Sequence, residues 1–303
     1  MIVDMPNTTA SKIGKRLNEL RETGGVVALG RVLTLVIATD AEHAETAIAA
    51  ANGASRLHPA RIIVMADVRD GSEPKLDAEI RVGGDAGASE VVILRAHGAA
   101  SSNPESLVTG LLLPDAPVVA WWPAQCKANP ASTPLGKIAQ RRITDSAAQA
   151  DPIQFLGELA NNYQPGDGDM AWTRITLWRS QLAALFEQHL DKRVTAIKVY
   201  GAHNSPSSVL LARWLEQRLQ AKSEIISELQ SVAVAGIAGV KLEFDNGSLE
   251  IMRKDEVAII KQVGFPDSSV LLPRRSDQDC LIEDMRFLGE DEIYGEVLKG
   301  SAK

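Results

Sequence analysis

Four short apolar runs constrain the fold of the first half of the chain more than any other feature. Each run is rich in valine and isoleucine and lacks a long polar interruption. Runs of this kind are typical of strands that are buried on both faces, as in parallel sheets. We therefore expect buried strands at residues 31–39, 60–68, 89–96 and 117–123.

Helical segments separate these runs. Residues 40–54 and 104–113 have the composition of helices, and residues 75–84 read as an additional strand paired by a turn. Strands that alternate with helices are connected by right-handed crossovers, which produce a mostly parallel sheet with helices outside it. The sequence thus predicts an α/β fold whose N-terminal domain is doubly wound and covers residues 1–150.

The pattern changes in the second half of the chain. A long amphipathic helix is expected after residue 169, and from Ser223 onward the pattern becomes antiparallel. Asp245-Asn246-Gly247-Ser248 gives a strong hairpin signal. We predict a second domain over residues 151–303, of the α+β type with antiparallel hairpins, closed by two acidic helices. Further helices and one strand are expected at 151–163, 205–220 and 194–201.

Composition excludes some classes of function. The 303 residues carry a formal charge of −7, with a pI near 5.4, which argues against sequence-independent binding of nucleic acid. The small basic spot at Arg141-Arg142 does not alter that balance. We expect no membrane span, because no apolar run reaches the required length. Without a visible signal peptide, a cytoplasmic location is expected.

Motifs for catalysis, metals and cofactors are missing. The stretch at residues 166–171 formally fits a dinucleotide fingerprint, but no strand precedes it, and Asp167 and Asp169 would repel a pyrophosphate. Those aspartates fit better as negative charge at a helix start. Cys126 and Cys280 form no metal-binding pair. We predict that the chain is not an enzyme and has no catalytic residues, metal site or cofactor.

Four of the five tryptophans lie in two stretches, residues 117–123 and 169–180. Trp121 and Trp122 must point to opposite faces if their run is a strand. Two interpretations are open. Large rings often pack at the boundary of a core, and the residues alone favour this interpretation. Tryptophan and arginine are also enriched where partner proteins dock.

The second stretch places similar residues on a helix. At helical spacing, Trp178 belongs to the apolar stripe, Trp172 and Arg179 lie on one flank of it, and Arg174 lies on the other. This helix would therefore present indole and guanidinium groups at the edge of its core face.

Several long stretches carry a resemblance to a known family. The chain resembles the actinobacterial glucose-6-phosphate dehydrogenase assembly proteins, the OpcA family. Leu177 stands where we expect proline in the family's helix motif, which predicts a more continuous helix. The two cysteines do not suggest thiol switching. The similar stretches are ALGRVLTLVI (28–37), AANGASRLHPARIIV (50–64), PESLVTGLLLPDAPVVAWWP (104–123), PLGKIAQRRITDS (134–146), GDGDMAWTRITLWRSQLAA (166–184) and SPSSVLLARWLEQRL (205–219).

The resemblance implies a non-catalytic partner that binds glucose-6-phosphate dehydrogenase, favours its active oligomer and supports the oxidative pentose phosphate pathway. Such a partner acts by binding the active state more tightly than the inactive one. Self-association of the chain stays open. From residue type and helical position, the candidate contact residues are Trp121, Trp122, Arg141, Arg142, Trp172, Arg174 and Arg179.

A second hypothesis is a binding protein for a sugar phosphate or a nucleotide, descended from an enzyme. It would use the crevice at the strand ends near Trp122, or the start of the helix at Ser205, where first-turn amides are able to receive an anion. A serine that simply caps its helix explains Ser205 more readily.

Overall fold

The structure is a computed structural model, and the chain divides into two compact units. The first unit comprises Met1–Ala148, Gln164–Gly168 and Ser276–Asp291, and the second comprises Gln149–Tyr163, Asp169–Arg275 and Glu292–Lys303. The predicted domain boundary at residue 150 lies close to Ala148, where the chain first leaves the first unit. The segment Ser276–Asp291 was predicted to belong to the second domain but lies in the first unit. The structure describes residues 1–23, 32–68, 73–83, 90–98, 104–229, 232–233 and 236–300.

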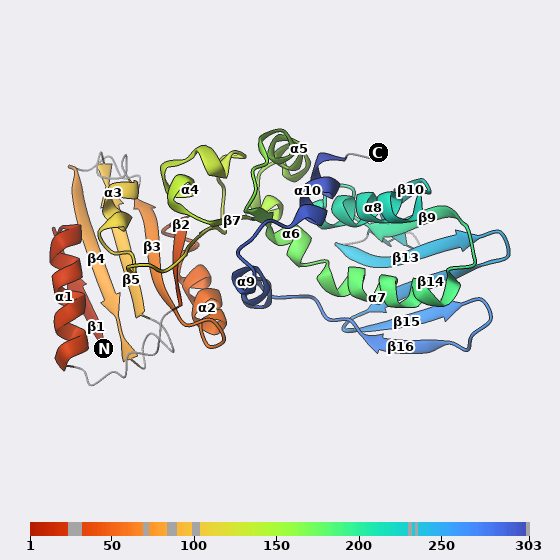
Figure 1. The fold of residues 1–303 in the computed structure, drawn as a ribbon, viewed down its shortest axis with the longest axis horizontal. Helices are drawn as coiled ribbons and strands as arrows, with labels where there is room; N and C mark the ends of the chain where they lie inside the picture. The colour runs from red at the N-terminus through yellow and green to blue at the C-terminus, as the bar shows by residue number, and fades with distance from the viewer. Residues whose placement is uncertain are drawn as a thin grey trace. The chain divides into compact units, whose positions relative to one another are not determined.

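The first unit is built on an eight-stranded sheet (Figure 1). The strand order is β1-β4-β5-β3-β2-β6-β7-β8, and β2 pairs in parallel with both β3 and β6. The expected mostly parallel α/β sheet is confirmed, with antiparallel pairing at β4. The strands are β1 (Ile2–Met5), β2 (Leu33–Asp40), β3 (Ala60–Val68), β4 (Lys75–Arg81), β5 (Glu90–His97), β6 (Val118–Trp122), β7 (Arg141–Thr144) and β8 (Asp167–Asp169).

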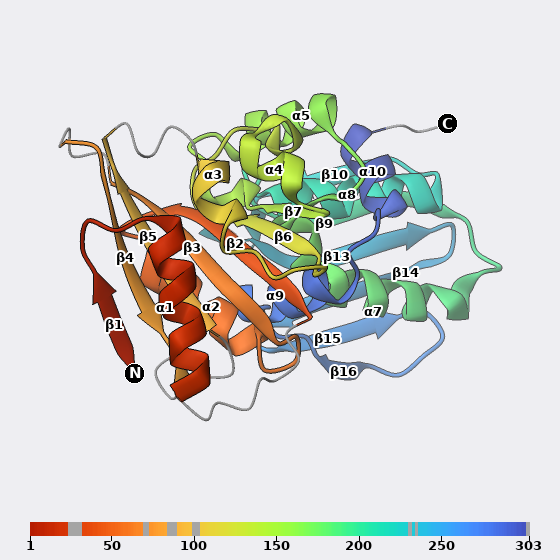
Figure 2. The same ribbon diagram turned by 60° about the vertical axis from the view of Figure 1, so that its left-hand side comes forward.

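Helices cover both faces of this sheet. One face packs against apolar residues of α1, α3 and α4 in a single core cluster that includes Ile13, Val108 and Leu135; Figure 2 shows α1 lying across the strands. On the other face, α2 packs on β2 and β3 and also against α9. The helices are α1 (Ala10–Thr23), α2 (Ala44–Ala54), α3 (Pro104–Thr109), α4 (Pro134–Ile138) and α9 (Asp277–Arg286), with 3-10 turns η3 (Pro130–Ser132) and η4 (Ser146–Ala148).

The second unit contains a six-stranded sheet in the order β10-β9-β13-β14-β15-β16 and a two-stranded ribbon, β11-β12. The predicted hairpin is confirmed: β13 and β14 pair antiparallel, with Phe244 opposite Gly247. The expectation that every strand beyond Ser223 is antiparallel is wrong, because β10 pairs in parallel with β9. The strands are β9 (Val194–Gly201), β10 (Ser223–Ile226), β11 (Glu228–Leu229), β12 (Val232–Ala233), β13 (Ile237–Phe244), β14 (Gly247–Lys254), β15 (Val257–Gln262) and β16 (Ser268–Leu271).

Helices pack on this second sheet and on one another. Helix α8 lies on β9 and β10, and α10 packs against α5 and α8. Ser205 is the N-cap of α8, since its side chain accepts a hydrogen bond from the Ser208 amide at 3.3 Å. None of the helices in the described part of the chain is long and apolar enough to cross a membrane. The helices are α5 (Pro152–Asn162), α6 (Met170–Thr173), α7 (Thr176–Phe186), α8 (Pro206–Leu219) and α10 (Glu292–Lys299), with the 3-10 turn η5 (Glu187–His189).

The expectation of a more continuous helix through Leu177 is wrong. Helix α6 ends at Thr173, and α7 begins at Thr176. The guanidinium of Arg275 donates to the Thr173 carbonyl oxygen at 2.7 Å, and the Ile175 amide bonds to the Trp172 carbonyl at 3.2 Å. A carbonyl satisfied from outside and a tight three-residue turn together interrupt the helix without any proline.

Candidate functional site

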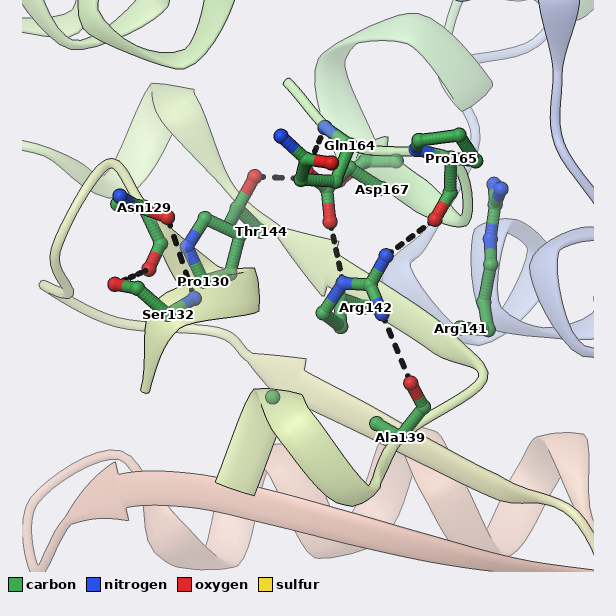
Figure 3. A network of polar contacts seen from close by, with 12 residues as sticks. Asn129, Pro130, Ser132, Ala139, Arg141, Arg142, Thr144, Gln164, Pro165 and Asp167 are labelled. Atoms are coloured by element: carbon green, nitrogen blue, oxygen red, sulfur yellow. Dashed lines mark hydrogen bonds and ion pairs between the residues drawn. The ribbon is translucent and has the colours of Figure 1, made fainter. Parts of the chain in front are cut away.

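Arg141 and Arg142, two of the predicted contact residues, occupy the start of β7, where every residue is buried. Neighbouring side chains on a strand point to opposite faces. In Figure 3, Arg142 turns toward Asp167. The guanidinium of Arg141 lies close to the same segment, since a Cβ atom added at Gly168 would stand 2.5 Å from its Nη2. The two guanidinium groups therefore make separate sets of contacts.

Arg142 is the centre of a polar network (Figure 3). Its Nε donates to Asp167 Oδ1 at 2.5 Å, its Nη1 to the Ala139 carbonyl at 2.9 Å, and its Nη2 to the Pro165 carbonyl. The other Asp167 oxygen accepts from the Gln164 amide at 2.8 Å. Charge-assisted bonds of this kind tie β7 to residues 164–168 inside the first unit.

Arg141 joins β7 to a distant helix. Its Nη2 lies 2.5 Å from Asp284 Oδ1 on α9, and both side chains are buried. Its Nη1 also reaches the Gly289 carbonyl at 3.5 Å. Both arginines are thus engaged internally, so their proposed role as outward contact groups lacks the exposure that docking requires.

Asp167 and Asp169 divide the role that the sequence gave them jointly. Asp169 is the N-cap of α6, because its carboxylate accepts from the Ala171 amide at 2.9 Å. Asp167 instead pairs with Arg142. The helix-start interpretation is confirmed for Asp169. It is wrong for Asp167, since a buried arginine provides the stronger partner.

The tryptophans are buried as well. Trp121 is 1% exposed and Trp172 is 2% exposed, and Trp122 and Trp178 are also buried. Burial confirms the place of Trp178 in the apolar stripe. Burial of Trp121, Trp122 and Trp172 agrees with core packing and contradicts the interpretation that their indoles form an exterior docking surface. All five residues of β6 are buried, so neither face of this strand is left for solvent.

Trp172 lies in an aromatic cluster of the second unit. Its ring lies between the guanidinium of Arg179, at 3.7 Å from the ring centroid, and the ring of Tyr294, at 5.8 Å between centroids. Tyr294 also packs edge-on against Tyr163. Arg174 and Arg179 are the two predicted contact residues that keep partial exposure.

Gly166 allows the chain to approach the Arg142 network. It has φ +90°, and a Cβ atom there would stand 2.4 Å from the Gln140 carbonyl oxygen. We expect Gly166→Ala to lower the free energy of unfolding by about 1–3 kcal/mol, because both the backbone angle and the contact become strained. Urea denaturation provides the measurement.

Gly157 provides a matched control for this change. It lies inside α5, and a Cβ there meets nothing within 4 Å. Gly157→Ala is expected to raise stability by about 0.5–1 kcal/mol through helix propensity. If the two variants shifted stability equally, the close approach at residue 166 would have no energetic weight.

A crevice of about 830 Å³ opens at the carboxyl ends of the parallel strands of the first unit. Ala38, Thr39 and Asp40 at the end of β2 line it, together with Trp122 at the end of β6. Because β2 lies between β3 and β6, the crevice lies where the chain changes its winding direction. Ligands of doubly wound folds bind at such switch points. The sequence pointed to this place through Trp122 but not to Thr39 or Asp40.

Asp40 and His43 form a polar pair at one edge of this crevice. The Asp40 carboxylate accepts from the His43 backbone amide at 2.9 Å and lies 2.8 Å from its Nδ1. The hydrogen bond to Asp40 raises the pKa of His43 above its ordinary value. Partial burial raises the pKa of Asp40, but the hydrogen bonds from His43 outweigh it, and the net shift is downward. Both shifts favour the charged form of the pair.

The donor set of the described residues does not point to a metal. No group of three or more histidine, cysteine or carboxylate side chains is placed to hold an ion in the part of the chain that the structure covers. Cys126 is half-buried and Cys280 is buried.

Comparison with known proteins identifies the family. The family model described as the glucose-6-phosphate dehydrogenase subunit N-terminal domain matches residues 51–161, and the model described as its C-terminal domain matches residues 165–298. No curated protein matches the chain. UDP-N-acetylglucosamine 3-dehydrogenase GnnA from Acidithiobacillus ferrooxidans is a similar solved structure, with a TM-score of 0.42 and 7% identity over 88% of this chain and 95% of that one. A likeness that weak says nothing about the activity of this chain. The two family matches, one in each half, agree with the resemblance in the sequence, and the chain belongs to the OpcA family of glucose-6-phosphate dehydrogenase assembly proteins.

Proposed function

We propose that this chain is a non-catalytic partner of glucose-6-phosphate dehydrogenase that binds the enzyme and favours its active oligomer. The observation that supports the proposal is the pair of family matches, which together run from residue 51 to residue 298. A partner of this kind shifts an assembly equilibrium only by its differential affinity for the two states. The cytoplasmic location, expected from the sequence, stays a prediction.

The proposal is tested with the two purified proteins. We expect the chain and the dehydrogenase to elute together in gel filtration at micromolar concentrations, and the substrate response of the enzyme to change when the chain is added. The chain alone should not oxidise glucose 6-phosphate. Separate elution together with an unchanged enzyme would contradict the proposal, and turnover by the chain alone would contradict its non-catalytic part.

Arg174 and Arg179 are the residues that we place in contact with the dehydrogenase. They retain exposure at the junction of α6 and α7, whereas the other five candidates are buried. Arginine at an interface contributes planar hydrogen bonding and a large contact area. On this proposal the buried residues Trp172 and Tyr294 hold the junction in shape.

Truncation of Arg174, one of the two contact arginines, should separate binding from stability. We expect Arg174→Ala to weaken the complex about tenfold, as removal of a central interface arginine does. Thermal unfolding of the variant should stay close to that of the parent. Arg218→Ala is the control, because Arg218 is exposed on α8 and makes only a 3.5 Å contact to Glu296. Equal affinity of the two variants would remove Arg174 from the interface.

A further inference from the structure

The crevice at the carboxyl ends of β2, β3, β5 and β6 has the size and position of a ligand site, independently of any partner protein. Its volume of about 830 Å³ lies within the ~300–1,000 Å³ of small-molecule pockets. It also lies at the switch point of the sheet, between β2 and β6. Below we call it the strand-end crevice.

One side of the strand-end crevice is apolar. Trp122, Met65 and Leu135 line it and belong to, or pack against, the core cluster of the first unit. Leu94 and Ala96 continue this lining at the end of β5. A sugar ring laid here would leave its hydroxyl groups without partners, which is unfavourable. A flat aromatic ring needs no such partners and packs well against an indole and a thioether.

The other side offers the Asp40 carboxylate at the end of β2. The Asp40 carboxylate accepts from the His43 amide and ring, and a carboxylate has about four acceptor sites. Capacity therefore remains for hydroxyl groups of a ligand.

The start of α2 is closed to phosphate. In a dinucleotide site, the pyrophosphate lies on the amides at this helix start and approaches through glycines. Here the Asp40 carboxylate already accepts from the His43 amide, and residues 40–43 contain no glycine. Glu42 adds negative charge at the same place. A pyrophosphate would meet repulsion there.

We propose that the strand-end crevice binds a nucleoside moiety, with the aromatic base against Trp122 and Met65 and the ribose hydroxyl groups at Asp40. The base satisfies the apolar side, and the ribose diol satisfies the acceptors. Recognition does not depend on a pyrophosphate, so a dinucleotide has no advantage over a single nucleoside.

Calorimetric titration of the full chain tests this assignment with four probes: adenosine, AMP, 2′,3′-dideoxyadenosine and NAD⁺. We expect adenosine and AMP to bind saturably. The dideoxy compound should bind about tenfold more weakly, because it lacks the diol that meets the carboxylate. NAD⁺ should bind no more tightly than AMP.

Asp40→Asn connects the effect to the proposed residue. The substitution removes the negative charge but keeps an oxygen for the His43 amide, at a site that is half-exposed. It should weaken adenosine about tenfold and leave dideoxyadenosine unchanged, because the two changes remove the same interaction. Asp191→Asn, at an exposed position of the second unit, should change neither.

Three results would overturn the assignment. One is the absence of saturable adenosine binding up to about 10 mM, beyond the weakest useful affinity. Another is equal adenosine affinity of Asp40→Asn and the parent chain. The third is binding of AMP without binding of adenosine, since the phosphate would then be the recognised group.

Discussion

Replacement of Arg142 by methionine is expected to lower the free energy of unfolding of the first unit by about 3–5 kcal/mol. Methionine keeps most of the aliphatic stem but leaves the Asp167 carboxylate buried without its cation. The carbonyl groups of Ala139 and Pro165 lose their donors as well. Urea unfolding, with the midpoint and slope compared between variants, gives the value.

Two controls make this result interpretable. Arg218→Met removes a cation from an exposed ion pair and should change stability by less than about 1 kcal/mol. Adding Asp167→Asn to Arg142→Met should recover part of the loss, because the unpaired charge disappears. A loss no larger than that of the exposed control, with no recovery in the double variant, would show that the network contributes little.

Truncation of Trp172 to alanine is the second large expected effect, a loss of about 3–5 kcal/mol from the second unit. The ring is 2% exposed and is enclosed by Arg179 and Tyr294. Its removal leaves a cavity between α6 and the aromatic cluster and removes a cation-π contact. Thermal and urea unfolding should both report the loss.

Trp214→Ala is the matched comparison, because Trp214 on α8 is only half-buried. Its truncation should reduce stability by clearly less than that of Trp172. After Trp172→Ala, binding to the dehydrogenase should fall by more than the folded fraction falls, because the ring of Trp172 supports the guanidinium of Arg179 at the proposed contact. Unchanged affinity of the folded variant would contradict that supporting role.

Local pattern was sufficient to predict most of the fold. The four predicted apolar runs form β2, β3, β5 and β6. Runs rich in valine and isoleucine are typical of strands in a sheet that is covered on both faces. The hairpin of β13 and β14 followed from its turn residues. These patterns depend only on residues that are close together in the sequence, so a single sequence is enough to recognise them.

Long-range pairing was not predictable in the same way. Arg141 finds Asp284 across 143 positions of sequence, and nothing near either residue indicates the other. The same holds for Arg275, which ends α6 from a distance of 102 positions. Residue type alone therefore suggested an outward surface where the fold forms internal ion pairs.

The candidate site was predicted in part. The position of a crevice follows from strand order, which the alternation of strands and helices implies. Its chemistry depends on which side chains end each strand and on what remains unpaired there. The hydrogen bond that the Asp40 carboxylate accepts from the His43 amide is visible only when backbone amides have been placed.

The return of α9 to the first unit affects how this protein is made. Synthesis on the ribosome delivers Arg141 long before Asp284, and helix α9, which completes the first unit, follows only after most of the second unit. The first unit therefore cannot complete its fold until translation is nearly finished. A chain released prematurely after residue 150 would expose a buried guanidinium and become a substrate for chaperones and proteases.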